Sequence, residues 1–203
     1  GHGQLGWHGD TVVALRTAAV TPTQIVASDV SDLSVKPPRT ALAADFDADG
    51  DLDLVVAHAN SFRLPLFRNL GGARHGQFAE AGSVAVFSSV SSALAAADFD
   101  GDGQLDLVVS NRRAPLRIYE NVSTSQNWIG VTLSQGAGNR AAIGATVTVN
   151  GQMQHRRIGG GHAGGSLVPL HFGLGDANKA TITVTWPDGT TQQTTTAANQ
   201  ITN

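Results

Sequence analysis

The chain has 203 residues, of which 14% are charged and 24 are glycine, and its formal net charge is −3. It contains no cysteine, which excludes disulfides and thiolate metal sites. No apolar run approaches the roughly 18 residues that a membrane-spanning helix needs, and no basic run with interleaved aromatic residues indicates nucleic-acid binding. Abundant Gly, Thr, Val and Ala, with only two glutamates, favour strands and turns over helices.

The N-terminal segment 1–23 precedes the repeats that the sequence shows. Within it, TVVALRTAAV at 11–20 is a candidate strand without a metal loop, and we consider it a strand that could serve in assembly with another chain. From 24 to 126 the chain repeats itself at a spacing of 53 positions, so that Gln24-Ile25-Val26 aligns with Gln77-Phe78-Ala79. A period near 50 residues is typical of one four-stranded sheet per unit, as in a propeller blade. For the first copy the sequence predicts strands near 24–28, 41–45, 52–58 and 64–69.

One nine-residue acidic loop occurs twice, as DFDADGDLD at 45–53 and as DFDGDGQLD at 98–106. Aspartate occupies positions 1, 3, 5 and 9 of both copies, and glycine at position 6 permits a sharp bend. Calcium takes six to eight oxygen ligands in flexible geometry, which carboxylates and the backbone carbonyl of position 7 can supply. The sequence therefore predicts two calcium sites, with Asp45, Asp47, Asp49, Asp51 and Asp53 in the first and Asp98, Asp100, Asp102, Gln104 and Asp106 in the second.

The spacing distinguishes these loops from other acidic motifs. An EF-hand places Glu at position 12, where Val56 and Val109 stand in LDLVV segments that indicate strands. Magnesium is less favoured because it demands near-octahedral geometry. A solvated acidic turn is the alternative, but both copies retain every ligand position. Without the two loops the chain has 13 basic against seven acidic side chains, a charge of +6, so its acidity is local. Because crowded carboxylates repel one another, we expect bound metal to supply folding free energy.

The sequence changes character near 123–127, and residues 127–203 contain no acidic loop. The Thr-rich GTTQQTTT at 189–196 is interpreted as an exposed strand, with an O-glycosylated patch as the alternative. The predicted fold class is all-β, with two propeller-blade-like four-stranded repeats followed by a C-terminal β-sandwich-like domain. The strands expected in that domain are WIGVTLS (128–134), ATVTVN (145–150), QHRRIGG (154–160), LVPLHFG (167–173) and ATITVTW (180–186).

Catalytic patterns are not evident in the sequence. The seven histidines are scattered, there is no Gly-x-Ser-x-Gly elbow, and carboxylate pairs occur only inside the metal loops. The Gly-rich segment GGGHAGG at 159–165 lacks the Lys-Ser/Thr of a phosphate loop. We therefore expect that the protein is not an enzyme.

Two stretches of the chain resemble known families. The segments ADFDADGDLDLVV and ADFDGDGQLDLVV, each followed by a short strand ending in Arg-Asn or Glu-Asn, resemble FG-GAP/VCBS repeats, over about residues 24–126. Residues 127–203 resemble an ASPIC and UnbV domain. The resemblance implies propeller-type blades with a calcium loop between strands, and secreted, extracellular or cell-surface proteins with non-catalytic roles in adhesion or matrix interaction. The second resemblance is carried by Asn139-Arg140, IGATVTV (143–149), LHFGLG (170–175) and TVTWPDGTTQ (183–192).

The number of repeats bears on function, because a closed propeller usually needs at least four blades. Two blades leave open sheet edges, which invite pairing with another chain. We therefore expect a structural or adhesion subunit that forms a homo-oligomer or a filament head to tail, with an N-terminal strand completing a neighbour's sheet. The alternative is a recognition module, part of a larger propeller protein, that binds a glycan or a foreign surface protein through its loops or through 159–165.

Overall fold

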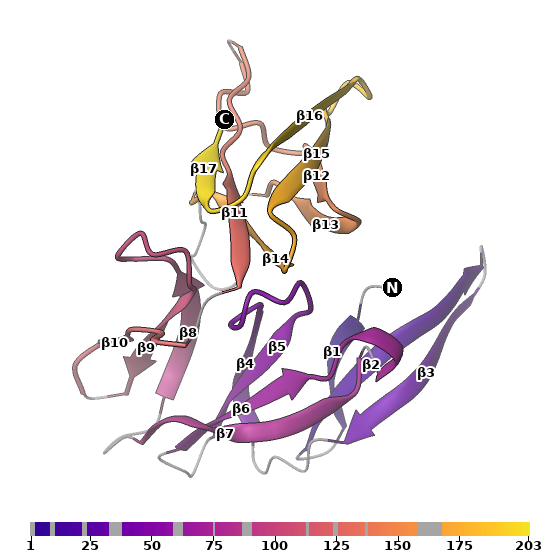
Figure 1. Ribbon diagram of the computed structural model, residues 1–203. Helices are drawn as coiled ribbons and strands as arrows, with labels where there is room; N and C mark the ends of the chain where they lie inside the picture. Colours follow the sequence, from indigo (N-terminus) through magenta and orange to yellow (C-terminus); the bar gives the residue numbers. More distant parts are fainter. Residues whose placement is uncertain are drawn as a thin grey trace. The chain divides into compact units, whose positions relative to one another are not determined.

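The computed structural model is all-β in the residues that it describes, as predicted (Figure 1). The described residues form strands β1 to β17 and one short 3-10 helix, η1 (Gly72–Arg74). Contacts divide the chain into two compact units: 1–46, 51–97 and 105–121 form the first, and 47–50, 98–104 and 122–203 form the second. The described residues are 3–8, 11–21, 24–32, 38–58, 63–74, 76–86, 91–112, 114–123, 126–136, 138–157 and 168–203.

No helix among these residues is long and apolar enough to cross a membrane. The Gly-rich segment 159–165, considered above as a binding loop, lies outside the described residues.

The N-terminal strands form an antiparallel sheet of their own. β1 (Gly3–His8), β2 (Thr11–Thr21) and β3 (Gln24–Asp32) lie in the order β1-β2-β3, so β2 has hydrogen-bonded neighbours on both sides. The segment 11–20, considered above as an assembly strand, is thus the central strand of this sheet. The first residues of β1, β2 and β3 precede those of β5, β6 and β7 by 50, 52 and 54 positions, close to the repeat spacing. The N-terminal sheet therefore corresponds to the last three strands of a further repeat.

The first complete repeat forms a four-stranded antiparallel sheet. Its strands are β4 (Pro38–Ala44), β5 (Asp53–His58), β6 (Arg63–Asn69) and β7 (Phe78–Val86), in the order β4-β5-β6-β7. The predicted strands near 41–45, 52–58 and 64–69 are confirmed. The strand near 24–28 exists as β3 but pairs with β2, and β7 completes the sheet in its place. The reason is that β6 and β7 are joined by a short connection, closed by the hydrogen bond from Leu70 N–H to Gln77 O at 2.9 Å, and short connections favour antiparallel neighbours.

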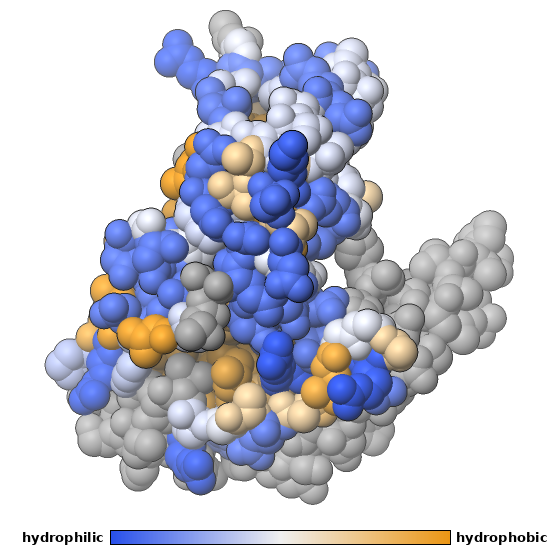
Figure 2. Space-filling model, viewed as in Figure 1, coloured by the Kyte–Doolittle hydropathy of each residue, from blue (hydrophilic) through white to orange (hydrophobic). Residues whose placement is uncertain are grey.

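The second repeat forms a smaller sheet within the described residues. β8 (Ser91–Ala97), β9 (Asp106–Asn111) and β10 (Arg117–Tyr119) lie in the order β10-β9-β8, with β10 at the edge. In the first repeat β7 pairs with the outer edge of β6. Among the described residues no strand pairs with β10 in the equivalent place. Figure 2 shows hydrophobic side chains at the surface where Figure 1 shows β9 and β10.

Strand β5 is buried on both faces and organises the first unit. Val55 and Ala57 pack in one core cluster with Leu107 and Val109 of β9, whereas the alternate residues of β5 form a second cluster with Phe67 of β6. Burying a valine fully contributes roughly 1.5–3 kcal/mol. This packing fixes the strand that follows each acidic loop, because β5 begins at Asp53 and β9 begins at Asp106.

The second unit contains the expected β-sandwich. One sheet has the order β14-β11-β17, made of Leu170–Gly175, Asn127–Val131 and Gln200–Thr202, and β11 and β17 are parallel. The other sheet has the order β13-β12-β15-β16, made of Gln152–His155, Thr146–Val149, Lys179–Thr185 and Thr191–Ala197. A single core cluster, which includes Ile129, Val147, Phe172 and Ile182, joins the two sheets. The strand interpretation of 189–196 is confirmed by β16.

Candidate metal centre

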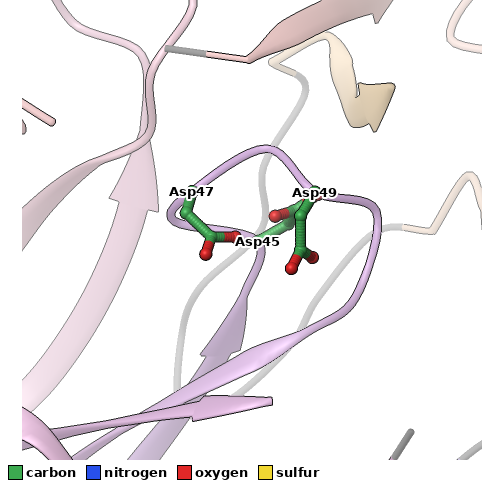
Figure 3. A group of neighbouring side chains, drawn as sticks. All are labelled: Asp45, Asp47 and Asp49. Atoms are coloured by element: carbon green, nitrogen blue, oxygen red, sulfur yellow. The ribbon is translucent and has the colours of Figure 1, made fainter. Parts of the chain in front are cut away.

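The first acidic loop connects β4 to β5 and brings three carboxylates together (Figure 3). One carboxylate oxygen from each of Asp45, Asp47 and Asp49 lies within 4.8 Å of the others, and Figure 3 shows all three side chains directed into the loop. Asp45 is buried and the other two are partly exposed. Gly50 adopts a φ of 96°, which lets the chain turn back toward β5. Positions 1, 3 and 5 thus form the first triad.

The second loop connects β8 to β9 and forms a triad from positions 1, 3 and 9. Carboxylate oxygens of Asp98, Asp100 and Asp106 lie within 4.8 Å of one another. Backbone N–H groups of the loop hold two of these side chains. Gly101 donates to Asp98 Oδ1 at 2.8 Å, Gly103 donates to Asp98 Oδ2 at 3.1 Å, and Asp102 donates to Asp100 Oδ1 at 3.1 Å.

Position 5 behaves differently in the two loops. In the second loop the Asp102 carboxylate accepts the Gln104 backbone N–H at 2.8 Å and the Gln104 side-chain amide at 2.9 Å. These bonds hold the Asp102 carboxylate against Gln104 at position 7, and Asp102 is outside the triad. In the first loop position 7 is Asp51, which has no side-chain donor when ionised, and Asp49 belongs to the triad. Asp51 and Gln104 themselves lie outside both triads, as expected if only their carbonyls serve as ligands.

Position 9 links each loop to the third strand of its repeat. Asp53 accepts the Asn69 backbone N–H at 2.9 Å and the Phe46 N–H at 3.3 Å, and Asp106 accepts the Asn121 N–H at 2.9 Å. Asp53 and Asp106 are each only 2% exposed. Hydrogen bonds to an ionised carboxylate are among the stronger ones, so this residue ties the loop to the sheet whether or not it also contacts metal.

Two asparagines repeat this linkage, and the sequence reasoning did not identify them. The Asn69 side-chain amide donates to Leu52 O at 3.3 Å, and the Asn121 amide donates to the equivalent Leu105 O at 3.2 Å. Asn121 also donates to Phe46 O of the first loop at 2.8 Å. The sequence signal is the final Asn of the two short strands that end in Arg-Asn and Glu-Asn, but its partners become visible only in the fold.

The tips of both loops belong to the second compact unit. Gly175 N–H donates to Ala48 O at 2.9 Å, and His171 Nε2–H donates to Gly103 O at 2.8 Å. The His171 ring stacks with Trp128, with centroids 5.8 Å apart and planes 11° from parallel. Burial lowers the pKa of His171 below its usual value, while its bond to Gly103 and the charge of Asp98 act in the opposite direction. A neutral imidazole with its proton on Nε2 matches this hydrogen bond.

The donor chemistry of both triads fits a hard divalent cation. Carboxylate oxygens are the ligands that calcium and magnesium prefer, and three of them in one small loop concentrate negative charge that a cation would neutralise. The first triad could hold a metal through Asp45, Asp47 and Asp49, and the second through Asp98, Asp100 and Asp106. Of the other predicted ligands, the position-9 residue Asp53 and the position-5 residue Asp102 lie outside these triads.

The fold and the sites define an all-β protein in which acidic-loop repeats are followed by a β-sandwich. A family model described as FG-GAP-like repeat matches residues 45–109, and a model described as ASPIC and UnbV matches 135–203. The chain contains both modules in this order and is homologous to cartilage acidic protein 1. The two family resemblances drawn from the sequence are thereby confirmed.

Curated relatives share about a third of their residues with this chain. It is 33% identical over 180 residues to cartilage acidic protein 1 of Mus musculus, a match that covers 75% of this chain and 26% of that protein. The protein of the same name from Homo sapiens is 32% identical over 180 residues, with 75% of this chain and 25% of that protein covered. The one from Xenopus tropicalis is 33% identical over 170 residues, with 75% and 26% covered. The chain thus spans about a quarter of the length of these relatives.

Proposed function

We propose that this chain is a non-enzymatic structural or adhesive module of an extracellular protein, stabilised by calcium at its two acidic loops and joined to further copies through an open sheet edge. The observation that carries the proposal is the occurrence of a carboxylate triad at the same place in two successive repeats. A duplicated site between equivalent strands supports a role in holding the sheets rather than in converting a substrate.

Calcium would act at these sites by neutralising charge. Each loop joins the first two strands of its sheet, and its carboxylates repel one another when ionised, so a bound cation would favour the folded loop over the unfolded chain. Calcium suits the sites better than magnesium because it accepts irregular oxygen cages. Asp45, Asp47 and Asp49 would hold one ion, and Asp98, Asp100 and Asp106 the other, with Asp53 tying the first loop to its sheet.

Two further observations support a non-catalytic, extracellular role. The clusters of metal-binding side chains in the described part of the chain are these two triads, whose aspartates are the predicted calcium ligands. Calcium modules that work outside cells bind with dissociation constants of about 10⁻⁴–10⁻³ M, which surface loops of this kind can reach. The homologous proteins are named for cartilage.

The open edge at β10 supports association between copies. In the first repeat β7 covers the outer edge of β6, whereas β10, the equivalent of β6, is the edge of its sheet among the described residues. Leu116 and Ile118 beside this edge are 60% and 55% exposed. β3 stands one repeat before β7 and is itself an edge strand. We therefore propose that β3 of one copy pairs with β10 of the next, which would extend head to tail into an oligomer or a filament.

Sedimentation velocity over a range of protein concentrations, with negative-stain imaging, tests this association. In millimolar calcium we expect oligomers or filaments that shorten when the calcium is chelated. Ile118→Lys should prevent them because a charge at a sheet edge opposes pairing, while Met153→Lys, a matched change on edge strand β13, should leave them intact. A wild-type monomer at about 100 μM protein in millimolar calcium would contradict the assembly, whereas stability that is indifferent to calcium would contradict the metal sites.

A further inference from the structure

The second unit contains a groove that neither the metal loops nor the β10 edge uses. It has a volume of about 490 Å³ and opens between the segment 131–134, which continues from β11, and strands β15 and β16. Pockets that hold small ligands are typically about 300–1,000 Å³, so the groove has room for one or two sugar rings.

The groove follows from the register of β15 and β16. Ile182 pairs with Thr194, and Val184 pairs with Gln192, so these four side chains lie on one face of the sheet. Ile182 and Val184 belong to the sandwich core and are 2% and 9% exposed, whereas Gln192 and Thr194 are exposed. The core-facing side of this sheet thus continues beyond the part that the other sheet covers, which gives the groove an apolar floor and a polar rim.

An aromatic ring is held in place at this groove. Trp186, directly after β15, is half-buried, and its Nε1–H donates to Gln192 Oε1 at 2.9 Å. The hydrogen bond joins the indole to the edge strand and limits its rotation. Trp and Tyr supply large contact surfaces at low conformational cost, which is why they serve as binding anchors.

The polar side chains of the rim are hydroxyls and amides. Thr132, Ser134, Thr194 and Gln192 line the groove with the Trp186 ring, and none of its lining side chains is charged. In Figure 2 the surface over β16 is correspondingly hydrophilic or intermediate in hydropathy. A neutral sugar has hydroxyl groups that can form hydrogen bonds with the amides and hydroxyls of the rim. It also has a C–H face that can pack against an aromatic ring. An acidic or basic ligand would find no opposite charge among these side chains.

We infer that this groove is a binding site for a neutral carbohydrate, with Trp186 as the ring that the sugar packs against and with Gln192 and Thr194 as polar contacts. The site gives a role to the Thr-rich segment 189–196, which the calcium sites leave unexplained. It depends on neither calcium nor association between copies, because its residues lie within the sandwich.

Titration of the intact, ¹⁵N-labelled chain with neutral sugars tests the site. Cellobiose, maltose and N,N′-diacetylchitobiose are each added to about 20 mM in calcium buffer, with sialyllactose as the charged comparison. We expect saturable shifts for at least one neutral sugar at the Trp186 indole N–H and at residues 131–134 and 192–194, with weak affinity in the millimolar range typical of shallow, small sites. Sialyllactose should shift these signals less than the neutral sugar that binds best.

Variants separate a sugar site from a structural role of the same residues. Trp186→Ala should weaken binding at least about tenfold, Trp186→Phe should stay within about threefold, and Thr194→Ala should weaken it about threefold or more. Thr195→Ala is the matched control on the same strand, because Thr195 is not among the lining residues, and it should bind as the wild type does. The remaining amide spectrum reports whether each variant is folded. Absence of groove shifts with all three neutral sugars, or unchanged binding in a folded Trp186→Ala variant, would overturn the inference, as would stronger binding of the charged sugar.

Discussion

The first loop gathers Asp45, Asp47 and Asp49, whereas the second gathers Asp98, Asp100 and Asp106, although their ligand spacing is the same. The sequence difference at position 7 accounts for part of this contrast. Gln104 donates its side-chain amide to Asp102 and draws it away from the triad, while Asp51 of the first loop has no such donor. A residue expected to contribute only its carbonyl therefore influences which carboxylates meet.

The loops also differ in charge and exposure. The first carries five carboxylates and the second four. Each triad has one buried member, Asp45 or Asp106, but only the second has an exposed one, Asp100. Since charge interactions strengthen as solvent is excluded, the first loop should bind calcium more tightly. The comparison teaches that a duplicated motif need not give two equal sites.

Removal of metal should have the largest effect of all. At a calcium concentration 100-fold above the dissociation constant, about 10 mM for a constant of about 10⁻⁴ M, bound calcium stabilises the folded state by about 2.7 kcal/mol per site. For a chain of 150–250 residues 1 kcal/mol corresponds to about 2–4 °C. Filling or emptying both loops should therefore move the melting temperature by about 10–20 °C in a scan with and without chelator. A melting temperature that chelation leaves unchanged, or that magnesium restores as well as calcium does, would contradict the account.

Substitution of the position-6 glycines should distinguish the two loop tips. Gly103 has a φ of 90°, and a Cβ there would overlap the Trp128 indole, so Gly103→Ala should destabilise by about 3 kcal/mol or more. At Gly50 the nearest atom to a Cβ is the side-chain amide nitrogen of Gln152, at 2.9 Å, which donates to Gly173 O. Gly50→Ala should therefore cost the backbone strain and part of this hydrogen bond, about 1–2 kcal/mol. Denaturant unfolding in calcium compares the two. Equal losses would show that Trp128 does not pack on Gly103 as described.

The paired asparagines give the next smaller contrast. Asn69 is buried, and its Oδ1 accepts N–H groups of the partly buried Gly71 and Gly76 at 3.3 and 2.9 Å. Asn69→Ala should therefore remove these two bonds and the bond to Leu52 O and cost about 2–3 kcal/mol. Asn121 is half-buried, and Asn121→Ala should cost about 1–2 kcal/mol through loss of its bonds to Phe46 O and Leu105 O. Chemical unfolding measures both variants, and a larger loss at Asn121 would reverse the expected order.

Exchange of the position-7 residues should have the smallest effect and bears directly on the cause of the inequality. Gln104→Asp removes the donor to Asp102 and should tighten the weaker calcium site about three- to tenfold, or about 1 kcal/mol. Asp51→Gln should weaken the tighter site by a similar factor. Competition with a calcium-sensitive dye measures both constants. If neither exchange alters its own site, position 7 does not determine the arrangement of the carboxylates.

The acidic loops, the strands on either side of them and strands of the C-terminal domain could be predicted, because each depends on local spacing. LDLVV and ATITVTW have the strand patterns that β5, β9 and β15 confirm. The two aligned loops allowed the same ligand positions to be predicted for both repeats, but not that Gln104 would bind Asp102.

Features that depend on long-range contacts could not be predicted. The pairing of β3 with β2 is decided by which strands a short connection brings together, and the repeat alignment alone is compatible with either grouping. The N-terminal strands are not assigned to a repeat by sequence because the alignment that identifies the repeats begins at Gln24, and only the sheet itself shows the equivalence. His171 and Trp128 meet Gly103 from 68 and 25 positions away, and no local pattern links them to the loop.

Calorimetric titration of calcium into the chelator-treated chain tests the central claim most directly. We predict two saturable sites of unequal affinity, with Asp47→Asn abolishing the tighter one and Asp100→Asn the weaker one, since each substitution removes one carboxylate of a single triad. Absence of saturable binding, or loss of the same site in both variants, would contradict the assignment of one calcium ion to each loop.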